Sequence, residues 1–441
     1  MIIGLLILII PAARAAANAG GERIGIRNGR FVNVGTGTTF VPVGCNVLRL
    51  ATLADGKKEH ATFCPGVYDS AETERMMRDL ETHGLNTVRA FQVYAVGPGG
   101  IMESKDAREI SPGYVANVVD FLRAARRHGI RVIFTWDMWL PESDHWAAEP
   151  VTGETEYRFQ PKWVTAMNSN NFMLTLPSVR TRSNAVLALI RAIRQTDASL
   201  LPVVLAWEIE NEIHFDVDKE PLKSRPAAFQ FAGRTYNLGS SKGAQDFMDD
   251  AFVQWCDFSA DAIHAADPEA LVSVSVFPFG AVGRPGPWHL LEHTTKDPRV
   301  PARPLALLRS KLDFIDLHIY AFTDGSPNGF ERNCEMQMAS DECPELQKAA
   351  LQAGKPILIG ETGVNTHLLK GASSRDGVQY PFDYRLGLSV LQKHLSQLKG
   401  AAFTGALVWY YGDNPATPNQ EYPLLETFPE YQDMLRNIYL K

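Results

Sequence analysis

Short apolar segments that alternate with amphipathic ones constrain the fold of this chain more than any other feature. Eight apolar segments are expected to form strands: residues 40–46, 86–91, 131–136, 203–210, 271–277, 314–320, 356–361 and 405–410. The amphipathic pattern predicts helices over 70–83, 111–128, 184–195, 244–266, 345–353 and 384–398. Near-continuous apolar strands are typical of a parallel sheet that is buried on both faces. Eight β-then-α units therefore predict an α/β fold of the (β/α)8 TIM-barrel type, with long loops after the strands.

A small N-terminal β-hairpin is expected ahead of the barrel. Residues 23–44 alternate apolar and polar side chains around Asn28-Gly29, and Asn-Gly is the dipeptide that two-residue hairpin turns prefer. A doubly wound open sheet is the alternative architecture. It is disfavoured because no glycine-rich phosphate loop of the G-x-G-x-x-G or G-x-x-x-x-G-K-[ST] type follows any strand. No sign of a second domain is present, so we expect residues 18–441 to form one domain.

The charge of the chain excludes one class of partner. It has 43 Lys and Arg against 50 Asp and Glu, a formal net charge of −7. No basic stripe of the kind that follows phosphates is present, so a nucleic-acid partner is not expected. Beyond the N-terminus no apolar run approaches the roughly 20 residues that a membrane span needs. We expect a monomer without membrane association once the N-terminal segment is removed.

The first 17 residues resemble a secretory signal peptide. Residues 2–10 are almost wholly apolar, and the small-x-small triplets 13–15 and 15–17 that follow fit a cleavage site. We therefore expect a secreted or periplasmic protein. A buried or tail-like N-terminus is the alternative, since no Lys or Arg precedes the apolar run.

Export would allow disulfide bonds between some of the five cysteines. Cys334 and Cys343 flank a short polar loop and are the first expected pair. Cys45 and Cys64 are the second. Cys256 lies in a helical pattern and is expected to stay a free thiol.

Polar residues gather at the ends of the expected strands, which is where a barrel of this type places its active site. They are Asn46, Arg89, Trp136, Asp137, Asn211, Glu212, His318, Tyr320, Glu361 and Trp409. Glu212 and Glu361 follow the fourth and seventh strands, which lie across a barrel from one another. Two facing carboxyl groups are what glycoside hydrolysis requires, one to give a proton and one to attack or stabilise the sugar.

These strand ends resemble clan A glycoside hydrolases, and family 5 of cellulases and β-mannanases most closely. Residues 207–212 (W-E-I-E-N-E) look like the family's W-x-x-x-N-E, in which the final Glu is the general acid/base. Residues 359–363 (I-G-E-T-G) resemble the strand that carries the nucleophile. Residues 86–89 (N-T-V-R), 316–320 (D-L-H-I-Y) and 408–409 (V-W) match its Arg, its H-x-Y motif and its Trp, after which the peptide bond is often cis. The third strand ends in F-T-W-D at 134–137 where many members have His, which leaves the subfamily open.

The resemblance implies that Glu212 is the acid/base and Glu361 the nucleophile, whereas Glu208 and Glu210 precede the position that the motif requires. Glu212 must be protonated when substrate arrives, so we expect its pKa to be raised. We expect Glu361 to be held as an anion. The expected substrate-binding residues are Asn46, Arg89, Trp136, Asn211, His214, His318, Tyr320 and Trp409.

The sequence thus predicts a retaining β-glycoside hydrolase of the two-glutamate, double-displacement type. Its expected partner is an oligo- or polysaccharide, either β-1,4-mannan or a β-glucan of the cellulose type, and no cofactor or metal is expected. A non-catalytic carbohydrate-binding barrel is one alternative, although such a barrel would be expected to lack one of the two acids. A serine hydrolase that uses the G-x-S-x-G match at Gly239, Ser241 and Gly243 is the other. It is disfavoured because no buried strand precedes the motif.

Overall fold

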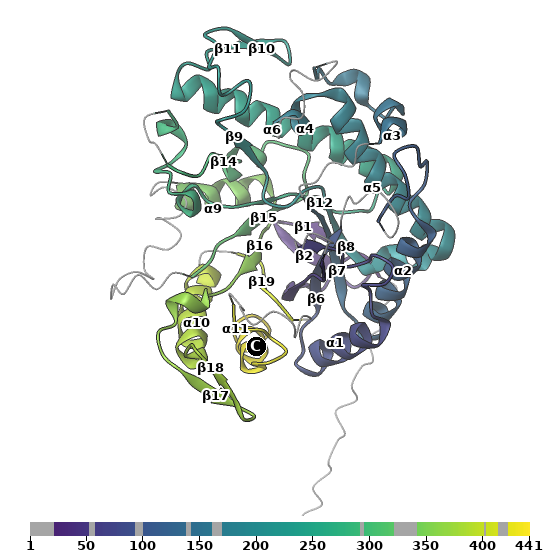
Figure 1. The fold of residues 1–441 in the computed structure, drawn as a ribbon, viewed down its shortest axis with the longest axis vertical. Helices are drawn as coiled ribbons and strands as arrows, with labels where there is room; N and C mark the ends of the chain where they lie inside the picture. The colour runs from purple at the N-terminus through teal and green to yellow at the C-terminus, as the bar shows by residue number, and fades with distance from the viewer. Residues whose placement is uncertain are drawn as a thin grey trace, which may run out of the picture.

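A parallel sheet closes into a barrel in the computed structural model, which describes residues 22–52, 58–92, 100–137, 143–160, 170–291, 295–321, 342–400, 403–412 and 422–441. Its strand order is β12-β8-β7-β6-β3-β19-β16-β15-β13 (Figure 1). The full-length strands are β3 (Val43–Val47), β6 (Thr87–Gln92), β7 (Arg131–Trp136), β8 (Val204–Glu208), β15 (Ile315–His318), β16 (Ile357–Thr362) and β19 (Ala406–Val408). Each lies within one or two residues of an expected strand or inside it.

The fifth expected strand closes the barrel in two pieces. β12 (Val272–Ser273) pairs in parallel with β8, and β13 (Ser275–Val276) pairs in parallel with β15. The two pieces are separated only by Val274, so one stretch of chain joins both edges of the sheet. The predicted (β/α)8 barrel is therefore confirmed.

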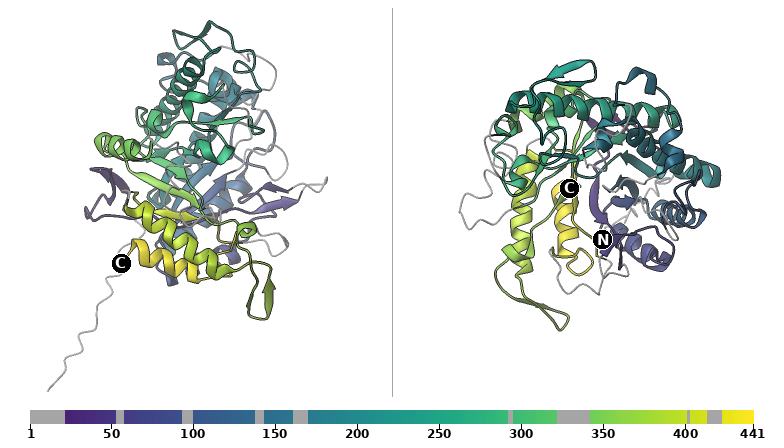
Figure 2. Two further views of the ribbon diagram at one scale, coloured as in Figure 1. Left: turned by 90° about the vertical axis from the view of Figure 1, so that its left-hand side faces the viewer. Right: turned by 45° about the horizontal axis from the view of Figure 1, so that its top comes forward.

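Helices surround the sheet, as the alternation predicts. The long ones are α1 (Ser70–Thr82), α2 (Pro112–Arg127), α5 (Leu176–Asp197), α6 (Ser241–Ala266), α9 (Glu342–Ala353), α10 (Tyr384–Gly400) and α11 (Glu430–Tyr439). Shorter ones are α3 (Asp144–Ala148), α4 (Asn171–Leu174) and α7 (Pro304–Leu307). α11, which the sequence did not predict, lies beside α10 (Figure 2).

Side chains explain where the helices begin. Asp69 accepts a hydrogen bond from the backbone N–H of Glu72 (3.0 Å) and caps α1. Ser240 does the same for α6 through Gly243 (3.1 Å), so the G-x-S-x-G match is a helix start and the structure gives no support to a serine nucleophile there. α5 begins at Leu176, whereas the sequence predicted a start at residue 184. The prediction missed the first turns because they bury polar side chains, which hide the apolar pattern.

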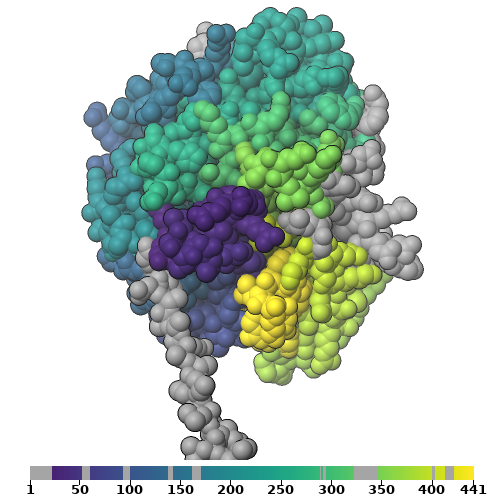
Figure 3. All heavy atoms as spheres, turned by 180° about the vertical axis from the view of Figure 1, so that it is seen from behind, coloured from purple at the N-terminus to yellow at the C-terminus, as the bar shows by residue number. Residues whose placement is uncertain are grey.

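The N-terminal hairpin is confirmed. β1 (Ile24–Arg27) and β2 (Arg30–Asn33) pair in antiparallel fashion around Asn28 and Gly29, whose φ angles of 53° and 69° fit the expected two-residue turn. The hairpin lies at the centre of the rear face (Figure 3). There Phe31 packs edge-on against Phe314 of the barrel, with ring centroids 5.1 Å apart.

Long segments follow the strands and carry small antiparallel ribbons. Those ribbons are β4 (Leu50–Thr52) with β5 (Lys58–His60), β9 (His214–Asp216) with β14 (Arg299–Pro301), β10 (Phe229–Phe231) with β11 (Arg234–Tyr236), and β17 (Ser373–Arg375) with β18 (Val378–Tyr380). Each ribbon strand lies in a segment that follows a barrel strand. The prediction of long loops after the strands is therefore confirmed, and the loops contain extra structure.

The cysteines follow the sequence predictions only in part. Cys45, Cys64 and Cys256 are free and buried, so the Cys45–Cys64 disulfide is wrong and the free Cys256 is confirmed. Each thiol packs among apolar core residues, and burial raises the pKa of Cys64 to about 11. The Cys334–Cys343 pair and residues 1–17 lie outside the described residues. Within the described ranges, the helices are too short or too polar to cross a membrane.

Candidate active site

The guanidinium of Arg89, fully buried at 0% exposure, organises the carboxyl end of the barrel. It donates two hydrogen bonds to Glu208, from Nε to Oε2 (3.1 Å) and from Nη2 to Oε1 (2.5 Å). Nη1 also donates to Glu361 Oε1 (2.7 Å) and to Asn46 Oδ1 (3.0 Å). A further bond runs from Nη2 to Asn211 Oδ1 (2.7 Å). One side chain from β6 thus connects β3, β8, β16 and the segment after β8.

Glu361 is held on two sides, close to where the register of β16 shifts against both neighbouring strands. It belongs to β16 and is 5% exposed. Its Oε1 accepts the hydrogen bond from Arg89, and its Oε2 accepts one from the hydroxyl of Tyr320 (2.7 Å). Burial raises the pKa of Glu361, and the nearby charges of His318 and Arg89 offset this only in part. The carboxyl is therefore positioned as a nucleophile requires, but the expectation of a low pKa is wrong for the free protein.

Glu212 reaches the site from irregular backbone beyond the end of β8. Its φ angle is 49°, in the left-handed region, and its backbone N–H donates to Ser275 Oγ (2.8 Å). Its side chain is 28% exposed and its Oε1 lies 3.0 Å from His318 Nδ1. Burial acts to raise the pKa of Glu212, but the hydrogen bond and charge of His318 outweigh it, so the pKa is lowered. The expected raised pKa is therefore wrong for the free protein, because His318 lies beside this carboxyl.

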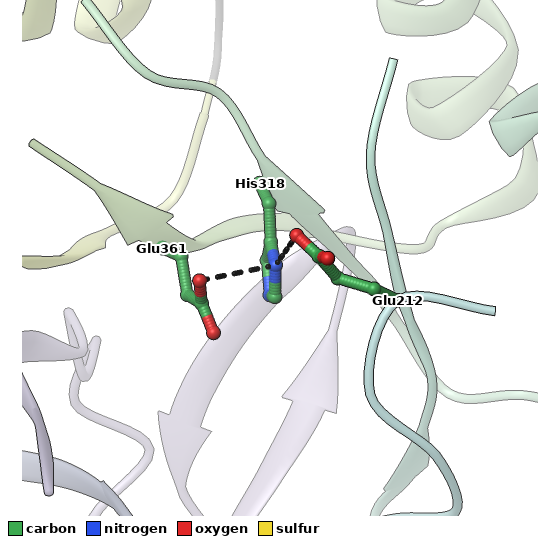
Figure 4. Close-up of side chains that lie close together, drawn as sticks. All are labelled: Glu212, His318 and Glu361. Carbon is green, nitrogen blue, oxygen red and sulfur yellow. Dashed lines mark hydrogen bonds and ion pairs between the residues drawn. The ribbon is translucent and has the colours of Figure 1, made fainter. Parts of the chain in front are cut away.

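His318 lies between the two glutamates (Figure 4). Its Nδ1 is 3.0 Å from Glu212 Oε1 and 3.5 Å from Glu361 Oε2. One ligand atom from each of the three side chains lies within 4.8 Å of the other two, so the two carboxyl groups are close neighbours. Two carboxylates and an imidazole are also donors that a divalent metal accepts. The expected independence of metals stays a prediction.

The other expected binding residues divide into supporting and accessible ones. Asn46 is buried and donates to the carbonyl oxygen of Gly360 (2.8 Å), next to Glu361. His214 is 5% exposed, and its Nδ1 lies 2.8 Å from the backbone oxygen of Glu212. Both therefore support the carboxyl-bearing backbone. Trp409 is half-buried, and its ring lies 5.7 Å from that of Phe91. The expected cis peptide bond after Trp409 is present.

Trp136 is a correction to the sequence prediction. It is 0% exposed and belongs to the apolar core outside the sheet, so a sugar has no access to it. Side chains alternate along a strand, and in β7 Thr135 is the residue that points into the barrel. Thr135 Oγ1 accepts from Arg89 (3.0 Å) and donates to Glu208 (2.7 Å). The alternation of side chains along β7 was the sequence signal that could have identified Thr135, and not Trp136, as the residue facing the site.

Sequence reasoning placed Glu208 and Glu210 outside the reacting pair, and the structure gives each a different partner. Glu208 is 0% exposed and pairs with Arg89 inside the barrel. Glu210 is also buried, but it lies beyond the end of β8 and pairs with Arg182 of α5. Glu208 is therefore part of the site's foundation, a role that the motif alone did not reveal.

Solved structures with a similar fold are sugar-degrading enzymes. The endo-1,4-β-mannanase of Rhizomucor miehei is 12% identical, with a TM-score of 0.55 over 95% of this chain and 98% of that one. The endo-1,4-β-D-mannanase of Thermotoga petrophila RKU-1 is 13% identical, with a TM-score of 0.57 over 91% and 100%. A family 5 mannosidase of Rhizomucor miehei is 14% identical, with a TM-score of 0.51 over 95% and 99%. At such identities the likeness establishes the fold.

A curated relative of a different kind is the 4-hydroxy-tetrahydrodipicolinate reductase of Sulfurimonas denitrificans. It is 33% identical over 135 residues, which are 29% of this chain and 51% of the reductase. The chain thus matches about half the length of this relative, too little to define a family. The model of the family described as "Cellulase (glycosyl hydrolase family 5)" matches residues 52–385, which is well over half of the chain. The chain therefore belongs to glycosyl hydrolase family 5, the cellulase family, and is a glycosidase.

Proposed function

We propose that this protein hydrolyses a β-1,4-linked mannan with retention of configuration, using Glu361 as the nucleophile and Glu212 as the general acid/base. The observation that carries the proposal is the close approach of the two carboxyl groups, within 4.8 Å of each other and of His318 Nδ1. Retaining glycosidases have carboxyl groups about 5–5.5 Å apart, whereas inverting ones leave about 6.5–9.5 Å for a water molecule. The short separation favours direct attack on the sugar.

In the first step Glu361 attacks C1 of the sugar while Glu212 protonates the leaving oxygen. Hydrogen bonds from Arg89 and Tyr320 fix the direction of the attacking carboxylate. The acid is formed on binding, because substrate removes water from the exposed part of Glu212 and desolvation raises a carboxyl's pKa. The 3.0 Å contact between His318 Nδ1 and Glu212 Oε1 keeps this carboxyl in position while it gives up its proton.

In the second step Glu212, now an anion, takes a proton from a water molecule on the face that the leaving group has vacated. That water attacks C1 and releases Glu361, so two inversions return the β-anomer. The proton taken from the water restores the acid form of Glu212 for the next cycle. The half-buried Trp409 offers an apolar face on which the sugar ring packs.

The choice of mannan is supported by the structural neighbours, of which two are 1,4-β-mannanases and a third is a mannosidase by their descriptions. The family description names cellulase, so a β-1,4-glucan is the competing substrate. Both polymers have a β-1,4-linked hexose backbone and differ at the sugar's C2 hydroxyl. The amide of Asn211, whose Oδ1 is fixed by Arg89, is the side chain that we assign to that hydroxyl.

The decisive experiment follows the anomer formed first. Purified protein is mixed with 1,4-β-mannan, carboxymethyl-cellulose, xylan and β-1,3-glucan, and proton NMR records the first product of any that is cleaved. We expect mannan to be cleaved fastest and the β-anomer to appear first. The Glu361→Gln variant is the matched control for contaminating activity. An α-anomer that appears first would exclude the retaining assignment, and a lack of cleavage of every glycan would favour the non-catalytic sugar-binding barrel.

A further inference from the structure

Three buried acids surround one guanidinium beneath the reacting carboxyls. Glu208 and Glu361 accept hydrogen bonds from Arg89, and Asp316 Oδ2 lies 3.6 Å from Arg89 Nε. Asp316 and Glu208 are 0% exposed and Glu361 is 5% exposed. If all three acids were ionised, three negative charges would crowd around Arg89 away from water, with the imidazole of His318 3.5 Å from Glu361 and 3.9 Å from Asp316, which is unfavourable. At least one of the acids must therefore hold a proton.

The hydrogen-bond donors show which acid that is. Glu208 Oε1 accepts from Arg89 and Thr135, and its Oε2 accepts from Arg89, as befits an anion. Among the described residues no N–H or hydroxyl donates to either oxygen of Asp316. Asp316 and Glu208 nevertheless face the same guanidinium nitrogen, since Arg89 Nε lies 3.1 Å from Glu208 Oε2 and 3.6 Å from Asp316 Oδ2. A fully buried carboxylate without a donor beside a second carboxylate is strongly unfavourable, so we assign the proton to Asp316.

Asp316 is also fixed in place. Its carboxyl occupies the space beside Gly360, where an added Cβ would overlap both of its oxygens. Gly360 directly precedes Glu361, and its carbonyl oxygen accepts from Asn46 (2.8 Å). Asp316 therefore has no room to turn away from Glu208 if it ionises.

We propose that Asp316 is a positioning residue that stays protonated while the enzyme works and donates its hydrogen bond to Glu208. The Asp316–Glu208 pair then carries a single negative charge, which Arg89 balances. Arg89 can then direct its Nη1 at Glu361. Glu361 keeps the negative charge that it needs to attack the sugar. Loss of the proton would place a new anion against Glu208, Arg89 and Glu361, with His318 Nε2 3.9 Å away as the remaining facing group.

The electrostatics agree with the geometry. Burial raises the pKa of Asp316 well above its ordinary value, and the negative charge of Glu208 raises it further. An aspartate with a raised folded-state pKa stabilises the protein fully below its unfolded pKa of about 3.9 and loses this contribution as pH rises toward the folded pKa. The natural protein should therefore lose stability, relative to a variant that cannot ionise at this position, across that range of pH.

Infrared spectroscopy tests the proton directly and without any need for activity. We expect the carbonyl band of a protonated acid at neutral pH in the Glu361→Gln protein, a background that removes the acid of the reacting pair whose pKa is raised. Burial also raises the pKa of Asp249, Asp257 and Glu426, so the signal assigned to Asp316 is the part of the band that is lost when Asp316→Asn is added. Asp313→Asn is the matched control and should leave it, since Asp313 accepts hydrogen bonds from Val272 N–H (2.7 Å) and from His264 (3.0 Å). Absence of the band, or an unchanged band in Asp316→Asn, would overturn the proposal.

Stability and kinetics give two further measurements. An amide mimics a protonated acid, so Asp316→Asn should fold, and failure to fold also contradicts the proposal. The unfolding constant of the natural protein should rise relative to that of Asp316→Asn by up to about tenfold per pH unit above pH 4.

The kinetic arm, which alone rests on the proposed function, compares Asp316→Asn with Asp316→Leu. The first should keep kcat within about threefold and extend activity to higher pH, whereas the second should lose about 10- to 100-fold in kcat at similar KM. Equal losses would contradict the donor role.

Discussion

The two glutamates of the site are chemically identical, and their surroundings are opposite. Glu361 lies within strand β16, nearly buried, with a donor on each carboxyl oxygen. Glu212 lies beyond the end of β8 with a left-handed backbone, a 28% exposed side chain and His318 beside its carboxyl. The first arrangement fixes a direction of attack. The second leaves a carboxyl whose proton affinity changes when substrate covers it, which suits a group that must be an acid in one step and a base in the next.

Removal of Glu361 should have the largest effect on activity and is the strongest test of the difference between the two glutamates. Glu361→Ala should lower the hydrolysis of every β-glycoside by roughly 10⁴-fold or more, because no other group is placed to attack C1. Thermal unfolding checks that the fold is kept. Added azide should yield at most an inverted product, which NMR can identify. Turnover close to that of the natural protein would refute the nucleophile assignment.

Removal of Glu212 should have a milder and substrate-dependent effect. Glu212→Ala should lower turnover of natural glycans by about 10²- to 10⁴-fold, the usual contribution of a general acid. Aryl glycosides with good leaving groups need little protonation, so they should still form the glycosyl-enzyme and release a burst of phenol. Stopped-flow measurement of that burst separates the two glutamates, and equal losses on both substrate types would mean that Glu212 is not the acid.

Tyr320→Phe tests the surroundings of Glu361 and leaves the contacts of Glu212 unchanged. It deletes the hydroxyl that donates to Glu361 Oε2 and should lower kcat by about 10- to 100-fold. This hydrogen bond lowers the pKa of Glu361, so its loss should raise that pKa further. In the free protein Glu361 has the higher pKa of the pair, so the alkaline limb of kcat/KM should move to higher pH. The acid limb, which reports Glu212, should stay in place, and a shift of that limb alone would contradict the assignment.

His318→Asn should give the smallest change in rate at the optimum and the most informative pH profile. Its charge lowers the pKa of both glutamates in the free protein. Both limbs of kcat/KM should therefore move to higher pH, by up to about one or two pH units. An unchanged profile would mean that His318 does not set the pKa of either glutamate.

Much of the fold and part of the site could be read from the sequence. Local patterns located the strands and the hairpin at Asn28-Gly29, because periodicity and turn chemistry act over a few residues. The strand ends also placed Glu212, His318 and Glu361 together before their contacts were known. The start of α5 was missed because buried polar side chains such as Thr181 and Arg182 hide the apolar face.

Properties that depend on neighbours from other strands could not be predicted. The pKa directions of the two glutamates are set by where His318 lies, and no sequence pattern gives that distance. Trp136 was assigned to the sugar because it ends a strand, yet the pleat turns it outward. The proton assigned to Asp316 follows only from the donors around Glu208, which come from two other strands.

The hairpin at the rear of the barrel makes the stability of the enzyme depend on residues 24–33, which lie far from the reacting groups in the sequence. Ile24 and Phe31 are buried against a ring of barrel side chains that includes Phe314, Leu358 and Leu407. Burial of the two side chains is worth about 3–6 kcal/mol, against a total stability of about 5–15 kcal/mol for an ordinary protein. A protease that trims the chain past Phe31 would therefore leave every group of the reacting face in place and still remove a large part of the enzyme's stability. Resistance to such trimming rests on the tight Asn28-Gly29 turn and on the pair that Arg23 makes with Asp267 (2.7 Å).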